Sequence, residues 1–251
     1  MNNKKFNISK IKIKAILEDK NAKIYLLNKP KNINSFKLVS KLRKVLNLKK
    51  VGFSGTLDPL ATGLMILATG RATKLLDYWH QFPKIYRAKI MFGRKSETYD
   101  LEGRVEINKD AKKFNKKELE NVLKDFLGKQ KQTAPIFSAK KINGVKLHIL
   151  ARKGKNVILP KSVIEIFYLK IINFKYPNLI LEIKCSAGTY IRSITNDVGK
   201  KLKTGALLID LKRISIGNLN INDSLDFIKI NKNNLKNNYI NPKEIIKFLD
   251  Q

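Results

Sequence analysis

The sequence predicts a mixed α/β domain of the α+β type, with a largely antiparallel sheet. Apolar residues alternate or form short runs in five strand-like segments, and three other segments carry the three-and-four spacing of a buried helical stripe. Helices are interspersed with strands that could pair as hairpins, and strict strand–helix repeats do not occur in the sequence. No Pro-, Ser- or Gly-rich linker divides the 251 residues, so one domain is expected over 1–251.

The expected elements follow one another along the whole chain. Strands are expected at 23–27, 64–68, 86–92, 162–174 and 179–185. The helix expected at 35–46 would bury a stripe made of Phe36, Val39, Leu42, Val45 and Leu46. Further helices are expected at 117–127 and 189–202, the second burying Ile191, Ile194, Val198 and Leu202.

The last part of the chain has a different composition. After Gly217 the sequence becomes rich in Asn and Lys, and it ends in a short helix-like piece at 242–249. This remainder is too short to bury a second core. We therefore expect it to pack on the first core or to fray.

The charge balance is strongly basic. The chain carries 52 Lys+Arg against 20 Asp+Glu, a formal net charge of +32, which points to a polyanionic partner such as nucleic acid. The alternative is that many lysines are solvated surface residues, since abundant Lys, Asn and Ile are typical of an AT-biased genome. No segment approaches the roughly 20 apolar residues of a membrane span, and the first residues lack the apolar core of a signal peptide. A cytoplasmic protein without membrane contact is expected.

The cysteine and histidine content argues against disulfide and metal chemistry. Cys185 is the only cysteine, and it alternates with Leu179, Leu181 and Ile183 on one face of an expected strand, which indicates core packing. His80 and His148 are the only histidines and lie far apart in the sequence. A histidine-based metal site is therefore not expected.

Asp58 is the only charged residue between Val51 and Gly70. Gly55 permits a tight turn before it, and Pro59 biases Asp58 toward an extended backbone that would hold the carboxylate in a fixed direction. This placement suits a catalytic acid. Asp before Pro is also ordinary turn chemistry, so a structural role remains the alternative.

Arg192 stands in the first turn of an expected helix, where a cation faces the positive end of the helix dipole. It also falls off the apolar stripe of that helix, so it does not simply cover the core with its stem. An acid opposite Arg192 would explain both facts. Asp197 and solvent are the other candidates for its partner.

Tyr86 begins an expected strand, and a polar loop dense in charge and hydroxyls follows Gly93. An aromatic side chain at the mouth of a basic site can stack on a nucleic-acid base. A strand tyrosine can equally be a half-buried packing residue. Neither phosphate-loop motif, Gly-x-x-x-x-Gly-Lys-Ser/Thr or Gly-x-Gly-x-x-Gly, occurs in a strand–turn–helix setting, so nucleotide-driven chemistry has no support.

Taken together and in order, these segments resemble the bacterial tRNA pseudouridine-55 synthases, the TruB family. The similar segments are 52–63, 70–74, Tyr86, Gly93, 98–100, 135–140, 144–148, 151–154, 188–192 and 211–213. They fall within 29–217, and the ordered set is far more specific than any one piece. The resemblance implies a pseudouridine synthase fold, with helices and loops flanking the sheet around a central active-site cleft. Residues 218–251 would be a short C-terminal extension, without the RNA-binding PUA domain that many relatives carry.

The resemblance also implies a reaction. Uridine at position 55 in the T-loop of tRNA would be flipped out and isomerised to pseudouridine without a cofactor or metal. Asp58 would be the nucleophile, Arg192 would pair with it and keep it ionised, and Tyr86 would stack on the base and assist proton transfer. Tyr190 and Leu211 would line the uracil pocket. The partner would be the T-arm of tRNA, with no protein partner, and the protein would act as a monomer.

Three positions depart from the family pattern. Phe53 stands where the family usually has a histidine that enters the space vacated in the RNA loop, so its contact there would be apolar. Asn32 replaces the glycine of a Lys-Pro-x-Gly-x-Ser segment, and Leu207 stands where Gly-Ala-His is common.

Two other functions compete with this one. The first is a guide-dependent synthase that shares the Asp-containing motif but acts on another RNA. The second is an RNA-binding protein or tRNA folding chaperone, in which Asp58 is only a turn residue.

Overall fold

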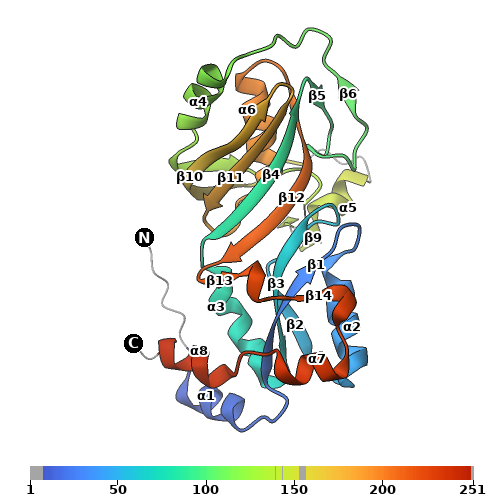
Figure 1. Ribbon diagram of the computed structural model, residues 1–251, viewed down its shortest axis with the longest axis vertical. Helices are drawn as coiled ribbons and strands as arrows, with labels where there is room; N and C mark the ends of the chain where they lie inside the picture. The colour runs from blue at the N-terminus through green and yellow to red at the C-terminus, as the bar shows by residue number, and fades with distance from the viewer. Residues whose placement is uncertain (1–7, 139, 143, 153–156, 250–251) are drawn as a thin grey trace. The chain divides into compact units, whose positions relative to one another are not determined.

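The computed structural model describes residues 8–249 except 139, 143 and 153–156 (Figure 1). The chain forms two compact units: unit 1 runs up to Phe82 and resumes at Lys212, and unit 2 is Pro83–Leu211. Each unit combines helices with strands that pair mostly antiparallel, which confirms the mixed α/β class. Strand β12 (Ala206–Ile216) passes through the boundary and contributes residues to both units.

Unit 1 is built on strand β3 (Thr62–Thr69), which pairs antiparallel with two strands. The other strands of this unit are β1 (Lys23–Lys29), β2 (Val51–Ser54), β13 (Leu219–Asn220) and β14 (Leu225–Asp226). Its helices are α1 (Lys10–Leu17), α2 (Ser35–Leu46), α3 (Leu76–His80), α7 (Lys232–Asn237) and α8 (Pro242–Leu249), with 3-10 turns η1 (Gly70–Leu75), η2 (Ile221–Asp223) and η3 (Phe227–Lys229). Lys212 and Arg213 of β12 lie parallel to the start of β3.

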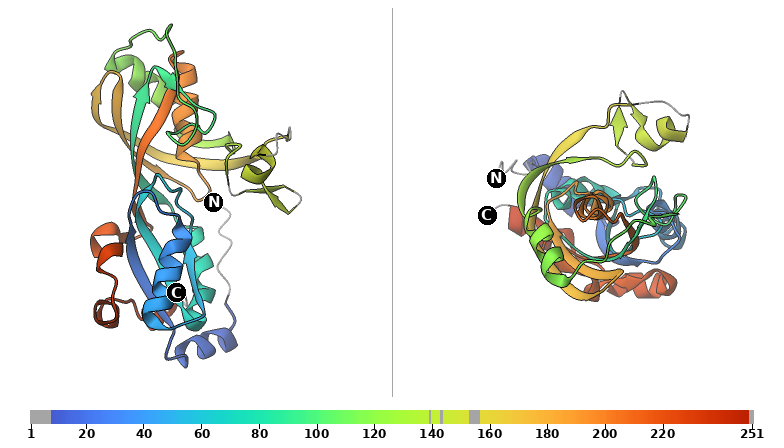
Figure 2. Two further views of the ribbon diagram at one scale, coloured as in Figure 1. Left: turned by 90° about the vertical axis from the view of Figure 1, so that its right-hand side faces the viewer. Right: turned by 90° about the horizontal axis from the view of Figure 1, so that it is seen from above.

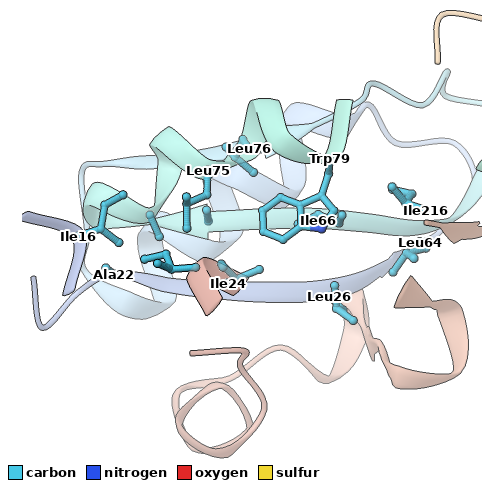
Figure 3. Packing of buried hydrophobic residues seen from close by; sticks show 13 residues of the cluster. Ile16, Ala22, Ile24, Leu26, Leu64, Ile66, Leu75, Leu76, Trp79 and Ile216 are labelled. Carbon is cyan, nitrogen blue, oxygen red and sulfur yellow. The ribbon is translucent and has the colours of Figure 1, made fainter. Parts of the chain in front are cut away.

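One face of the β1–β3 pair carries a hydrophobic cluster of unit 1 (Figure 3). Ile24 and Leu26 of β1 and Ile66 of β3 belong to this cluster together with Trp79 of α3, which is 3% exposed. Burial of this much apolar surface is the main force that holds the sheet and α3 together. The described part of the C-terminal segment packs on the same unit: Ile24 and Ile240 exchange two backbone hydrogen bonds, and Leu235 and Ile246 are buried.

Helix α2 begins and ends where the sequence predicts, but its buried face is different. Asn34 caps its start by accepting from the Lys37 N–H, and Asn47 ends it in the left-handed conformation. The buried residues are Ser35, Leu38, Val39 and Leu42. Phe36 was expected in the buried stripe and is 56% exposed, so that expectation is wrong.

Unit 2 contains a strongly paired antiparallel sheet. The strands of unit 2 are β4 (Lys84–Phe92), β5 (Arg94–Lys95), β6 (Glu106–Ile107), β7 (Gly128–Thr133), β8 (Lys141–Ile142), β9 (Val145–Lys146), β10 (Lys161–Lys175) and β11 (Asn178–Cys185). Of these, β5 and β6 form a two-stranded sheet of their own, as do β8 and β9. Its helices are α4 (Lys116–Lys124), α5 (Leu147–Arg152) and α6 (Ile191–Lys201). The main strand order is β12-β4-β11-β10-β7. In the left view of Figure 2, the yellow-green β8–β9 hairpin and α5 project away from β7 and β10, which they connect.

The β11 strand confirms the predicted role of the cysteine. Leu179, Leu181, Ile183 and Cys185 are all buried on one face, and burial raises the pKa of the Cys185 thiol to about 12. A thiol that stays protonated over the whole physiological range is a packing group. Among the described helices, none is both long and apolar enough to cross a membrane.

Candidate active site

The Asp58 loop connects β2 to β3 in unit 1 and comprises residues 55–61. Asp58 itself is half-buried, whereas the flanking Leu57 and Leu60 are 4% and 6% exposed. The Asp58 carbonyl accepts a hydrogen bond from the Ala61 N–H at 3.0 Å, which closes a turn. Two buried leucines thus anchor the loop on either side of the half-buried Asp58.

Ser35, the first residue of α2, fixes the loop one residue before Asp58. Its hydroxyl donates to the Leu57 carbonyl and accepts from the Leu57 N–H, both at 2.9 Å. One residue after Asp58, the Pro59 carbonyl accepts from the Asn32 N–H at 2.9 Å. Both neighbours of Asp58 are therefore held by the segment that leads into α2.

Asn32, which stands where the resemblance places a glycine, has a backbone conformation that glycine favours. Its φ is +63°, in the left-handed region, which Asn tolerates better than most residues other than glycine. The turn between β1 and α2 therefore keeps a conformation that glycine would also adopt, and it delivers the Asn32 N–H to Pro59.

Two fully buried cations support the same loop. Lys29 is 0% exposed, and its ammonium donates to the carbonyls of Pro30 at 3.0 Å and Pro59 at 3.3 Å. Arg213 is 1% exposed, and its guanidinium donates to the carbonyls of Leu64 at 2.7 Å and Gly55 at 3.0 Å. Such buried donors are costly to leave unpaired, so each bond resists displacement of the loop.

Phe53 lies in β2 of the same unit, opposite Leu67 of β3, and is half-buried. It stands two residues before Gly55, whose φ of +69° starts the loop. A Cβ at Gly55 would come within 3.3 Å of the Arg213 guanidinium. The positive φ therefore suits a residue without a side chain there.

Arg192 lies at the start of α6 in unit 2 and is 6% exposed. Its Nη1 donates to the Thr98 carbonyl at 3.1 Å and its Nη2 to the Phe137 carbonyl at 3.0 Å. These two bonds fix the plane of the guanidinium. The side chain is therefore buried, although it falls outside the apolar stripe of its helix.

An acid does lie beside Arg192 within unit 2, and it is Asp100. Its Oδ2 is 3.6 Å from the Arg192 Nε, and the two side chains are 1% and 7% exposed. The Asp100 Oδ1 also accepts from the Thr98 hydroxyl at 2.6 Å and from the Glu102 N–H at 2.9 Å. Asp100 was absent from the predicted site residues, although it closes the 98–100 segment that carries part of the resemblance.

Tyr190 is the residue that precedes α6, and a buried glutamine holds its backbone. The Gln132 side chain accepts from the Tyr190 N–H at 2.8 Å and donates to the Tyr190 carbonyl at 3.0 Å. The tyrosine is half-buried. These two hydrogen bonds from Gln132 of β7 set where the N-terminal end of α6 lies within unit 2. They therefore also set the position of Arg192.

Tyr86 and Leu211 lie on two strands that neighbour each other in the order of the sheet, β4 and β12. Tyr86 is half-buried and pairs with Ile183 of β11. Leu211 is 7% exposed. Three residues before it, the Leu208 N–H donates to the Tyr99 carbonyl at 3.0 Å, so the loop carrying Asp100 is bonded to the strand carrying Leu211.

Two titratable groups near α6 have shifted pKa values. Burial raises the pKa of the Asp197 carboxyl. Burial also raises the pKa of Tyr99, with a further rise from the Asp197 charge and an opposing effect of Arg192. The charges of Asp197 and Arg192 thus both act on Tyr99, and Asp100 is an acid of unit 2 within ion-pair distance of Arg192.

No group of three or more His, Cys, Asp or Glu residues suited to a metal ion occurs in the part of the chain that the structure describes. Parts of two segments of the resemblance, residue 139 in 135–140 and residues 153 and 154 in 151–154, lie outside the described residues.

Residues 43–191 match the family described as TruB family pseudouridylate synthase, N-terminal domain. This match covers more than half of the chain. The chain belongs to the TruB family. It is 41% identical to tRNA pseudouridine synthase B of Clostridium kluyveri over 209 residues, which are 83% of this chain and 72% of the relative. The corresponding protein of Clostridium tetani is 40% identical over 216 residues, 86% of this chain and 74% of the relative.

Solved structures show the same fold at lower identity. A chain of a Cbf5-Nop10-Gar1 complex superposes with a TM-score of 0.64 and 22% identity, covering 83% of this TruB-family chain and 53% of that chain. A chain of an H/ACA RNP bound to a substrate RNA containing 2'-deoxyuridine superposes with a TM-score of 0.63 and 20% identity. The match covers 86% of this chain and 53% of that chain. The predicted pseudouridine synthase fold is confirmed.

Proposed function

We propose that this chain isomerises uridine 55 in the T-loop of tRNA, with Asp58 as the nucleophile. Conversion of uridine to pseudouridine in tRNA is the activity of its family and of the curated relatives. The reaction breaks the bond between N1 of uracil and C1' of ribose, turns the base, and forms a bond from C5 to the same C1'. The proton lost from C5 is balanced by the one gained at N1, so no co-reactant is consumed.

The observation that carries the assignment of Asp58 is the way its loop is held. Ser35 bonds Leu57, and Asn32 and Lys29 bond Pro59, so the backbone on both sides of Asp58 has fixed partners. A nucleophile needs a direction that does not change when the substrate binds, because misplacement by about 1 Å can cost about 100-fold in rate. A carboxylate that only capped a turn would not require this support.

Arg192 is proposed to pair with Asp58 and to keep it ionised in the presence of the substrate. Within unit 2 its guanidinium has two carbonyl partners and the Asp100 carboxylate, which orient it before any substrate binds. Asp100 is a positioning residue in this proposal, since it would act through Arg192.

The remaining residues are proposed to bind the flipped nucleotide and the RNA loop. Tyr86 would stack on the target base and assist proton transfer, and Tyr190 and Leu211 would line the uracil pocket. Phe53 would enter the space that the flipped base leaves and stack there, because a phenyl ring can replace base stacking but not a hydrogen bond. Both units are proposed to work as one catalytic domain over 1–251, acting as a monomer in the cytoplasm and needing no cofactor.

Modification of tRNA transcripts tests this assignment. Purified protein is incubated with unmodified tRNA in the presence of EDTA, and pseudouridine is mapped by chemical probing. We expect modification at the T-loop uridine with the parent protein and with Asp110→Asn, an exposed acid in the loop after β6. Asp58→Asn should abolish it. Pseudouridine formed by Asp58→Asn would refute the nucleophile, and RNA binding without any pseudouridine would favour an RNA chaperone.

Two further measurements test how the RNA is held. Phe53→Ala should slow modification of full tRNA, and unchanged kinetics would remove the wedge role. The affinity for tRNA should fall steeply from low to high salt, because lysine and arginine contacts release counterions from phosphates. A flat salt response would mean that most of the 52 basic residues do not touch RNA.

A further inference from the structure

Phe36 is the large apolar side chain of α2 that faces solvent. It is 56% exposed, although the helical spacing predicted it in the buried stripe. Single exposed apolar residues are common on protein surfaces and need no function. The position of Phe36 and the charges around it distinguish it from that ordinary case.

Phe36 follows directly after a residue that is hydrogen-bonded to the Asp58 loop. The residue before it, Ser35, makes both of its hydrogen bonds to Leu57. Two helical turns later, the Arg43 Nη2 donates to the Val51 carbonyl at 3.3 Å, at the start of β2. From Phe36 to Arg43 the helix rises about 10 Å. From Val51 to the end of β2 the strand covers about the same distance in the opposite direction.

The segment around Phe36 is basic without interruption. Between Asp19 and Asp58 there is no acidic residue, while there are ten basic ones. They are Lys20, Lys23, Lys29, Lys31, Lys37, Lys41, Arg43, Lys44, Lys49 and Lys50. Lys31 and Lys37 are exposed near the start of α2, and the Arg43 guanidinium lies 5.7 Å from the centre of the Phe36 ring. An exposed ring among cations is how proteins bind unpaired nucleotides, with stacking on the ring and phosphates on the cations.

We propose that Phe36 stacks on an unpaired nucleotide of the substrate RNA next to the target uridine, with Arg43 steadying the ring. The inference rests on the proposed function, which brings an RNA loop to Asp58. Flipping the target out of the loop removes a stacking partner from its neighbours, and a second ring beside the Asp58 loop offers them a replacement. Phe36 would thus be a substrate-binding residue that affects affinity and leaves the chemical step alone.

Fluorescence of a Phe36→Trp variant tests stacking directly. Trp79 is the only native tryptophan and is 3% exposed, so acrylamide should quench mainly the introduced indole. The probe RNA is an unmodified T-arm stem-loop. We expect saturable quenching of the indole emission by this RNA, together with a several-fold loss of acrylamide access. Binding is measured without turnover, so the result does not depend on whether pseudouridine forms.

Kinetics with matched variants give the second readout. Phe36→Ala should raise the Kd and KM for the stem-loop by about 5-fold or more, as loss of one base–aromatic stack predicts, with kcat at saturating RNA unchanged. Phe36→Tyr should restore binding, and Ile11→Ala, at an 83% exposed apolar residue of α1, should leave it unaffected. RNA that fails to change the indole signal, or a Kd for Phe36→Ala equal to that of Ile11→Ala, overturns the proposal even if pseudouridine forms. Quenching without any pseudouridine would refute the proposed function and leave the stacking intact.

Discussion

Unit 1 and unit 2 each contain a buried arginine, and the two arginines have different partners. Arg213 of unit 1 is 1% exposed and donates to the carbonyls of Leu64 and Gly55. Arg192 of unit 2 is 6% exposed and combines two carbonyls with the carboxylate of Asp100. Carbonyl partners suit an arginine that holds backbone in place. A carboxylate at 3.6 Å makes Arg192 part of a charged network, which suits a role in the chemistry.

The largest effect should come from the ion pair of unit 2. Asp100→Asn removes the carboxylate from a buried guanidinium, and breaking such a pair costs about 3 kcal/mol or more in the free energy of unfolding. We also expect kcat to fall about 100-fold, because Arg192 loses its orientation. Urea denaturation and single-turnover modification measure the two effects. The control is Asp125→Asn, whose pair with Lys201 is solvent-exposed and should contribute less than about 1 kcal/mol. Equal losses of unfolding free energy in Asp100→Asn and Asp125→Asn would contradict the distinction between the buried and the exposed ion pair.

Arg213→Lys tests the arginine of unit 1. A lysine keeps the charge but cannot reach both carbonyls with the fixed geometry of a guanidinium, so the free energy of unfolding should fall by about 2 kcal/mol. The Asp58 loop would lose its bond at Gly55, so kcat should fall while KM for tRNA changes little. Arg71→Lys, at an exposed residue, is the control. If the Arg213→Lys protein were destabilised but kept a normal kcat, Arg213 would not be needed to position the Asp58 loop for the reaction.

Ser35→Ala removes the two hydrogen bonds to Leu57 and leaves a buried N–H and carbonyl without that partner. The expected loss is about 1 to 2 kcal/mol in the free energy of unfolding, with a fall in kcat. Ser40→Ala, whose exposed hydroxyl bonds the Phe36 carbonyl at 3.3 Å, should change stability by less than about 0.5 kcal/mol. Thermal unfolding of the parent protein, Ser35→Ala and Ser40→Ala would show whether Ser35→Ala is the least stable of the three.

The smallest effect is expected at Asn32. Asn32→Gly should leave stability within a few tenths of a kcal/mol, since glycine accepts a φ of +63° without strain. Asn32→Ala should cost about 1 kcal/mol, because Cβ crowds the following carbonyl in the left-handed region. The melting temperatures of the two variants test this comparison, and a more stable alanine variant would show that the turn is not strained.

Much of the fold could be predicted because local patterns specify it. The limits of α2 follow from its capping residues, and the alternation in β11 identified the face on which Cys185 packs. Strand β12 was missed, because Lys212 and Arg213 interrupt its apolar pattern. The burial of Arg213 depends on carbonyls of β3 and the Asp58 loop, which lie far away in the sequence.

The candidate active site likewise combines features that local sequence patterns predict with features that depend on residues far apart in the sequence. The unfavourable place of Arg192 at a helix start predicted an acid opposite it, with Asp197 and solvent as the alternatives, but it did not point to Asp100. Phe36 was placed in the buried stripe, because periodicity gives the faces of a helix and does not say which one meets the sheet. The support of the Asp58 loop by Lys29 and Ser35 was not foreseen, since neither residue type indicates such a contact by itself.

The sequence alone determined the fold class, the order of the motifs and, through them, membership of the TruB family. These follow from information that is local along the chain: spacing, turns and short segments. The tertiary structure decided which charges are buried, that Asp100 lies within ion-pair distance of Arg192, and how the backbone around Asp58 is fixed. Those outcomes depend on residues that meet only when the strands pair and water is excluded, because a buried donor or charge must then find its partner wherever the fold supplies one.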